Sequence, residues 1–185
     1  IADAWESRRS EVEDAARQIV GALDLGIAPV PGAGPGPDEV VRAARLVMKN
    51  ADWSRGGFGA GPKFPTPTNL ELLLAALDFL DADERQAVAT HLSKTAEEMA
   101  RRGLYDHLGG GFHRYCVDGE WTIPHFEKML YDQGLLLRFY AEMHRRGLSE
   151  DDPAWPMRET VDFLRREMTS PEGGFYASQD ADAGG

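Results

Sequence analysis

The sequence predicts an all-α fold of antiparallel helical hairpins, with one or two short β-hairpins in glycine-rich loops. Apolar residues recur along most of the chain at the three-to-four-residue spacing of amphipathic helices. Gly-Gly-Phe occurs three times, ending at Phe58, Phe112 and Phe175, at intervals of about 55 to 60 residues. Each interval holds a helix, a long loop and a second helix, which is the pattern of stacked hairpins.

The N-terminal segment is expected to be separate from the repeats. Residues 1–28 form an N-terminal helix, with helical periodicity over 3–24. The stretch 29–37 holds four Pro and three Gly and is expected to be a loop or linker. Because the chain opens on Ile1 rather than Met, we expect it to be processed or cut from a longer polypeptide.

Residues 38–185 are expected to form about three hairpins. Asp38 caps the first helix, Thr68 or Asn69 caps the second, and Gly103 ends the third in the left-handed conformation. A hairpin is expected around Asp118-Gly119. The helices are expected at 38–48, 69–80, 84–102, 124–146 and 153–169.

The long loops should carry the function. Successive helices in such a stack run antiparallel, so the Gly-Gly-Phe loops should lie at one end. Loops on a rigid scaffold usually hold binding and catalytic residues. The glycine pairs themselves are consistent with turn geometry alone, so the chemistry is expected at their neighbours.

Composition excludes several classes of function. The formal net charge of −11 argues against a nucleic-acid binder, which needs a basic face. The single cysteine, Cys116, excludes an internal disulfide and fits a reducing, cytoplasmic compartment. No apolar run is long enough to span a membrane, so no membrane partner is expected. No phosphate-loop, dinucleotide or zinc-protease motif occurs, and no cofactor is expected.

The densest group of chemical side chains lies between Tyr105 and Asp132. Three of the five histidines fall there, interleaved with aromatic residues. A sugar site needs this mixture, because aromatic faces pack on sugar rings, charged groups bind hydroxyls and imidazole moves protons. The catalytic candidates are His113, His125 and Glu127, and the substrate-binding candidates are Arg114, Trp121, Tyr131 and Asp132.

The local geometry of these candidates has alternatives. With Pro124 at the first helical position, His125 and Glu127 fall in the first turn, beside the positive end of the helix dipole. His125 and Asp132 would then share a face. Alternatively, Glu127 only caps the helix and His125 bonds a loop carbonyl. In an extended segment His113 and Arg114 alternate sides, and Arg114 could instead pair with an acid of the Asp118–Glu120 turn.

Two further candidates lie in the other loops. Asp180, as a catalytic group, and Asp182, as a substrate-binding group, form a pair of carboxylates suited to acid–base work. Hydrogen bonds to loop amides are the alternative. Gly stands at the third ligand position of a calcium loop, so no metal is expected. Lys63 is a candidate contact for an anion or a hydroxyl.

Four runs of sequence resemble a known family. They are Gly56-Gly57-Phe58 with Pro62-Lys63-Phe64-Pro65, GGGFHRY at 109–115, WTIPHFEKMLYD at 121–132 and GGFYASQDAD at 173–182. They resemble the spermatogenesis-associated thioredoxin-like protein family. Its members join a thioredoxin-like domain to a six-hairpin (α/α)6 toroid similar to that of N-acylglucosamine 2-epimerase.

The resemblance implies the first half of a toroid, truncated at its C-terminus and preceded by a thioredoxin-like domain that residues 1–28 link to it. Cys116 stands where relatives usually have Ser. The implied function is a carbohydrate-active enzyme, epimerase-like or glycoside-hydrolase-like, whose partner is a small sugar or glycan. The alternative is a non-catalytic module that binds a glycan or a protein. We also expect the open faces of the truncated stack to self-associate.

Overall fold

The computed structural model describes residues 2–27, 34–149 and 154–182. The chain divides into two compact units, Ile1–Gly34 and Pro35–Gly185, which are treated separately below. Most of the expected linker at 29–37 lies outside the described residues. Among the described helices, none combines the length and the apolar character needed to cross a membrane.

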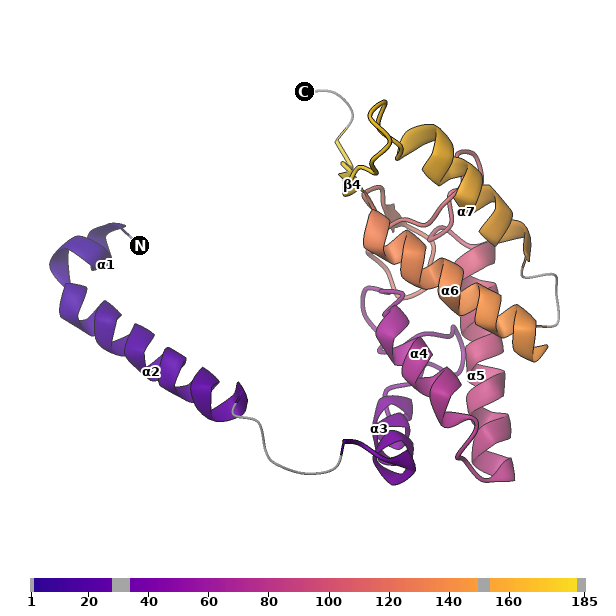
Figure 1. The fold of residues 1–185 in the computed structure, drawn as a ribbon, viewed down its shortest axis with the longest axis horizontal. Helices are drawn as coiled ribbons and strands as arrows, with labels where there is room; N and C mark the ends of the chain where they lie inside the picture. The colour runs from indigo at the N-terminus through magenta and orange to yellow at the C-terminus, as the bar shows by residue number, and fades with distance from the viewer. Residues whose placement is uncertain (1, 28–33, 150–153, 183–185) are drawn as a thin grey trace. The chain divides into compact units, whose positions relative to one another are not determined.

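The first unit holds two helices where the sequence predicts one. They are α1 (Ala2–Ser7) and α2 (Arg9–Ile27), with the break at Arg8 (Figure 1). The Arg9 guanidinium lies 4.4 Å from the centre of the Trp5 ring and bonds Glu13 one turn ahead. The apolar side chains of this unit remain about half exposed: Trp5, Ile19, Val20 and Leu23.

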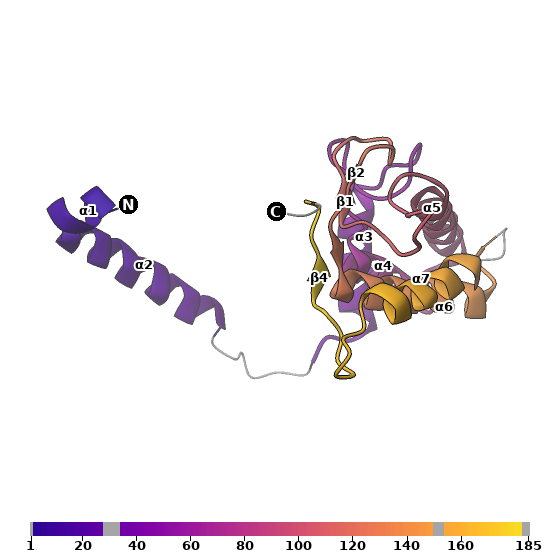
Figure 2. The same ribbon diagram turned by 90° about the horizontal axis from the view of Figure 1, so that it is seen from above.

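The second unit is a stack of helices. They are α3 (Pro37–Met48), α4 (Pro67–Ala76), α5 (Ala82–Arg101), α6 (Leu130–Arg146) and α7 (Ala154–Glu167). Helix α4 packs against α3, α5 and α6, and α6 packs against α7. Neighbours in sequence run in opposite directions, as expected for hairpins (Figures 1 and 2). The core between them is rich in leucine and aromatic side chains, including Leu70, Leu73, Leu92, Leu136, Phe139 and Tyr140.

The helix starts differ from the expected ones for local reasons. Gly36 and Thr66 are the N-caps of α3 and α4, because Pro37 and Pro67 occupy the first helical positions. Gly103 does not adopt a left-handed conformation after α5. It is glycine for another reason, since a Cβ there would collide with the Thr122 carbonyl oxygen.

Short strands replace the first part of one expected helix. Strand β1 (Tyr115–Cys116) pairs antiparallel with β2 (Pro124–His125), which confirms the hairpin around Asp118-Gly119. Strand β3 (Lys128–Met129) pairs antiparallel with β4 (Ser178–Gln179). The helix expected from Pro124 therefore begins only at Leu130, because residues 124–129 direct their backbone groups to strand partners.

The three Gly-Gly-Phe loops share one backbone pattern. In each loop one N–H returns to the carbonyl of a glycine, and the residue after Phe donates back across the loop. The first bonds are Asp52–Gly57, Asp106–Gly111 and Ser170–Gly174, and the second are Gly59–Asn50, His113–Leu104 and Tyr176–Met168. The repeat seen in the sequence is therefore a repeat of loop structure.

Two of these loops each enclose a buried lysine. Lys63 is fully buried, and its Nζ donates to Asp52 Oδ2 at 2.7 Å and to the carbonyls of Gly56 and Gly59 at 3.1 and 2.7 Å. Its backbone bridges the next loop at Cys116. Lysine and aspartate thus close one loop and hold it to its neighbour.

Lys128 repeats this arrangement in the second loop. Its Nζ donates to Asp106 Oδ2 at 2.7 Å and to the Gly110 carbonyl at 2.8 Å. Burial alone would raise the pKa of Asp106, but bonds from the Gly109 N–H and from Lys128 lower it to about 2. Through Gln179, β3 continues the contact into the third loop. The long loops therefore meet one another, as the antiparallel stack predicts.

The glycines leave room for rings from the following repeat. Gly57 and Gly111 have φ of +67° and +81°. A Cβ on Gly57 would lie 2.6 Å from the Trp121 ring, and one on Gly111 would lie 2.7 Å from Phe163. Only glycine combines this backbone conformation with so close an approach.

The substitution Lys63→Met tests the first buried pair. It leaves Asp52 and two loop carbonyls without their donor, so we expect the free energy of unfolding to fall by about 3 kcal/mol. Lys49→Met, the same change at an exposed lysine, should alter it by less than about 0.5 kcal/mol. Urea denaturation followed by circular dichroism measures both. Equal losses in the two variants would contradict the structural role of Lys63.

A buried histidine on α5 predicts sensitivity to acid. His91 is 1% exposed and packs against the rings of Trp53 and Phe58 at 5.5 and 5.3 Å. Neither ring nitrogen has a hydrogen-bond partner among the described residues. Burial lowers the His91 pKa to about 4, against an opposing effect of the Asp52 carboxylate.

Because the folded-state pKa is depressed, protons bind the unfolded chain first as pH falls below 6.5. We therefore expect the wild type to lose about 3 kcal/mol of stability relative to His91→Phe between pH 6.5 and 4. Denaturant titrations of both proteins at several pH values measure the difference. Parallel pH profiles would exclude His91 as the source of the sensitivity.

Candidate functional site

The β1–β2 hairpin brings Arg114, His125 and Glu127 together. The Arg114 N–H donates to the Glu127 carbonyl at 2.7 Å, and Arg114 Nη1 donates to Glu127 Oε2 at 2.8 Å. His125 Nδ1 lies 4.0 Å from the same oxygen, beyond hydrogen-bond length. The bond from Arg114 to Glu127 raises the Arg114 pKa. Glu127 is therefore the centre of this group.

This geometry corrects three expectations. His125 lies in a strand, so it neither occupies a first helical turn nor shares a helical face with Asp132. Arg114 pairs with Glu127 and not with Asp118 or Glu120. Asp118 instead accepts backbone N–H groups of its own turn, and Glu120 pairs with Arg55.

Asp132 adds a buried carboxyl group beside the pair. It lies in the first turn of α6 and is 5% exposed. Burial raises the pKa of Asp132 to about 6. The positive charge of Arg114 acts to lower this pKa, and the negative charge of Glu127 raises it further. Such a group exchanges its proton near neutral pH, which is the property that general acid–base catalysis requires.

Three stacked rings border the cluster. Phe64 stacks on Tyr115 with ring centres 4.5 Å apart, and Tyr115 stacks on His125 at 4.9 Å. The first of these rings comes from the first loop and the other two from the β1–β2 hairpin. Phe126, which is exposed, meets His113 edge-on at 5.2 Å. An aromatic surface thus lies next to the charged groups.

The pairing of β3 with β4 brings Asp180, a carboxylate of the third loop, near Glu127. Lys128 pairs with Gln179, so Asp180 follows at the position across from Glu127. Asp180 Oδ1 accepts the Asp182 N–H at 3.3 Å, and neither residue is buried. Tyr131, the remaining exposed candidate, is about half exposed. Like Glu127, but less strongly, it raises the pKa of Arg114.

Three candidates are placed in the interior. Lys63 and Trp121 are fully buried, and the Trp121 indole N–H donates to the Arg55 carbonyl at 2.9 Å. Their polar groups already have partners, so this placement does not fit the expected contact with a ligand. His113 is 5% exposed, and burial and Lys128 lower its pKa. Arg114, on the opposite side of the segment, is exposed, as alternation predicts.

Sequence reasoning missed the residues that fix the loops. Asp106 and Lys128 hold the second loop, and the Gln133 side chain bonds both backbone groups of Phe112. A signal was available, because an aspartate stands six residues before Phe in both DWSRGGF and DHLGGGF. The third repeat has Ser170 in the corresponding hydrogen bond.

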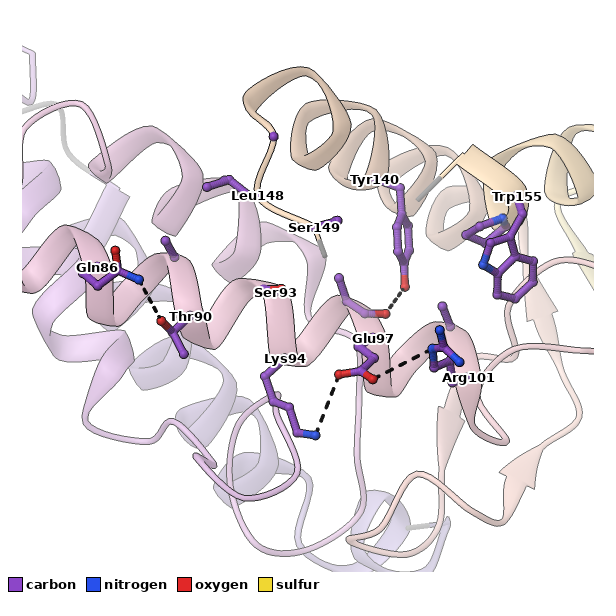
Figure 3. Close-up of a pocket in the computed structure, with 15 residues that line it drawn as sticks. Gln86, Thr90, Ser93, Lys94, Glu97, Arg101, Tyr140, Leu148, Ser149 and Trp155 are labelled. Carbon is purple, nitrogen blue, oxygen red and sulfur yellow. Dashed lines mark hydrogen bonds and ion pairs between the residues drawn. The ribbon is translucent and has the colours of Figure 1, made fainter. Parts of the chain in front are cut away.

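A groove of about 500 Å³ lies elsewhere, along α5. None of the sequence candidates lines it. Its charged side chains pair among themselves, as Lys94 does with Glu97 (Figure 3). Within residues 2–27, 34–149 and 154–182, no three His, Cys, Asp or Glu side chains are grouped to hold a metal ion.

The comparisons with known proteins fit the resemblance noted in the sequence. Mouse spermatogenesis-associated protein 20 is 32% identical over 194 residues, 99% of this chain. The human protein of the same name is 37% identical over 147 residues, 77% of the chain. The chain resembles one stretch of spermatogenesis-associated protein 20. An uncharacterized Caenorhabditis elegans protein is 41% identical over 129 residues, 69% of the chain.

The chain spans between 18% and 24% of the length of these relatives. No family model matches it. The name spermatogenesis-associated protein 20 mentions neither a reaction nor a ligand.

The raised Asp132 pKa predicts that this residue reduces stability. The neutral form is favoured in the fold, so stability is lost as pH rises from about 4 through 6. We expect Asp132→Asn to raise the free energy of unfolding by about 3 kcal/mol at pH 8 and to leave it unchanged at pH 3. Asp162→Asn, at an exposed position on α7, is the control. A destabilised Asp132→Asn at pH 8 would contradict this prediction.

Proposed function

We propose that the chain is part of a carbohydrate-active protein, and that Arg114, His125, Glu127 and Asp132 bind a sugar and move protons on it. The observation that carries this proposal is the buried Asp132, with a pKa of about 6, beside the Arg114–Glu127 pair. A buried carboxyl group whose pKa is raised toward neutrality lowers the stability of the fold, and such groups concentrate at functional sites.

The aromatic surface supports a sugar as the ligand. Sugar rings have apolar faces that pack on aromatic rings, and Phe64 and His125, the two outer rings of the Phe64–Tyr115–His125 stack, are partly exposed. Arg114 can donate hydrogen bonds to hydroxyl oxygens, and Glu127 can accept hydrogen bonds from hydroxyl groups. One ligand of this class would use both kinds of group.

Two reactions suit these residues. In an epimerase or isomerase, His125 would exchange a proton at the carbon beside the carbonyl of an open-chain sugar, and Arg114 would stabilise the enediolate oxygen. In a glycoside hydrolase, Asp132 would protonate the leaving oxygen while a second carboxylate, such as Asp180, acts across the bond. Both use Asp132 or its neighbours as proton carriers.

The proposal extends to the longer protein. We place the chain in the first part of an (α/α)6 toroid that follows a thioredoxin-like domain, in the cytoplasm. The stacked hairpins of α3–α7 and the similarity to spermatogenesis-associated protein 20 support this assignment. The single cysteine, Cys116, is buried, and burial raises its pKa to about 12, which fits a chain without thiol chemistry here.

The full-length protein tests the reaction. It is incubated with a panel of hexoses and N-acetylhexosamines in heavy water, and with oligosaccharides. Deuterium uptake at carbon 2 would identify an epimerase, and release of reducing ends would identify a hydrolase. We expect Asp132→Asn to lower the rate by a factor of about 100 or more, and Asp162→Asn to leave it unchanged.

Binding without turnover of any of these sugars would instead favour the alternative, a non-catalytic module. The pairing of Arg114 with Glu127 in the free chain favours this second candidate, because Glu127 already has a partner. If neither binding nor turnover is found across the panel, the carbohydrate proposal is wrong.

A further inference from the structure

We propose that the site, if it binds sugars as proposed above, accepts uncharged sugars and rejects phosphorylated or carboxylated ones, with Glu127 as the specificity-determining residue. The reason is that Glu127 neutralises Arg114, the partly exposed cation of the cluster. This inference rests on the proposed function and adds the charge class of the ligand.

The Arg114–Glu127 pair is held in place by more than its side chains. The two residues are also joined through the backbone, from the Arg114 N–H to the Glu127 carbonyl at 2.7 Å. The side chains of Arg114 and Glu127 are 44% and 22% exposed, so the carboxylate is the better shielded of the two. An anionic ligand that reaches the guanidinium would therefore also lie close to the negative charge of Glu127.

The other cations near the cluster are also neutralised. The Lys63 and Lys128 side chains are 0% and 5% exposed, and each ammonium group is bound to an aspartate of its own loop. Arg55, at the edge of the first loop, pairs with Glu120. In the part of the site that the structure describes, each of these four cations has its own carboxylate, and none is left for a phosphate.

The remaining charges of the cluster are negative. Asp132 lies beside Glu127, and Asp180 and Asp182 follow in the third loop, with Asp180 at the position across from Glu127. A phosphate or carboxylate on the ligand would face these groups without a compensating cation. Like charges brought together at a binding site cost affinity and reject the wrong ligand.

A neutral sugar avoids both costs. One hydroxyl group can accept from Arg114 and donate to Glu127 at the same time, so the ion pair stays intact. The aromatic surface beside the pair then contributes packing that does not depend on charge. The geometry therefore favours a polyhydroxylated ligand without an acidic group.

Titration calorimetry on the full-length protein tests this selectivity. Each neutral hexose and N-acetylhexosamine of a panel is compared with its own 6-phosphate at the same ionic strength. We expect every neutral sugar that binds to do so at least about tenfold more tightly than its phosphate.

The variant Glu127→Gln isolates the cause. The amide keeps the shape of the side chain and removes its negative charge, so the charge of Arg114 is no longer neutralised. The ratio of the affinities for the sugar phosphate and the neutral sugar should then rise at least about tenfold. Glu142→Gln is the matched control, because it removes the partner of Arg145 near the far end of α6 from the cluster and should leave the preference unchanged. Thermal unfolding of each variant establishes that it is folded.

The outcomes separate the two proposals. If phosphorylated sugars bind the wild type as tightly as the neutral ones, the selectivity is wrong while the carbohydrate function stands. An unchanged preference in a folded Glu127→Gln protein would also overturn the role of Glu127. If no sugar of either kind binds, the carbohydrate function itself fails.

Discussion

The burial of two lysine ammonium groups is the constraint on which the loop end depends. Lys63 and Lys128 carry charges that cannot stay buried without partners, and each finds them in an aspartate and in the carbonyls of a Gly-Gly-Phe turn. Each turn must therefore close around its lysine, which needs glycine at the tight positions. Because the backbone of each lysine also pairs with the following loop, the three loops are ordered as one surface.

The candidate site follows from that order. Lys128 fixes the start of β3, and Glu127 is the residue before it, so the second buried pair sets where the central carboxylate lies. Arg114, the residue before β1, and His125, in β2, both approach Glu127 from the adjacent hairpin. Asp132 arrives from the first turn of α6. The functional groups are thus carried by short segments whose positions the buried charges determine.

The sequence predicted what periodicity and composition encode. Helical spacing and the triple Gly-Gly-Phe predict the hairpin stack, and alternation predicts that His113 and Arg114 lie on opposite sides without saying which of them is buried. The predicted start of α6 at Pro124 is wrong, because proline fits the first position of a helix as well as a strand. Pairing with β1 makes residues 124–125 a strand, and that pairing is not visible in the local sequence. The sequence offers Lys63 as a ligand contact, because it does not reveal that the Lys63 charge is paired with Asp52 inside the fold. The pairing of Arg114 with Glu127, thirteen residues away, depends on the same hairpin.

We propose that Asp132 carries protons at the site because its surroundings raise its pKa toward neutral pH. Its pKa can be measured by following the side-chain carboxyl carbon in a pH titration with ¹³C nuclear magnetic resonance, with Asp132→Asn assigning the signal. The structure gives a midpoint of about 6, since burial and the nearby Glu127 both oppose ionisation. A midpoint near 4, the value of an exposed aspartate, would mean that the carboxyl group is solvated and that the cluster around Glu127 is not a site for proton transfer.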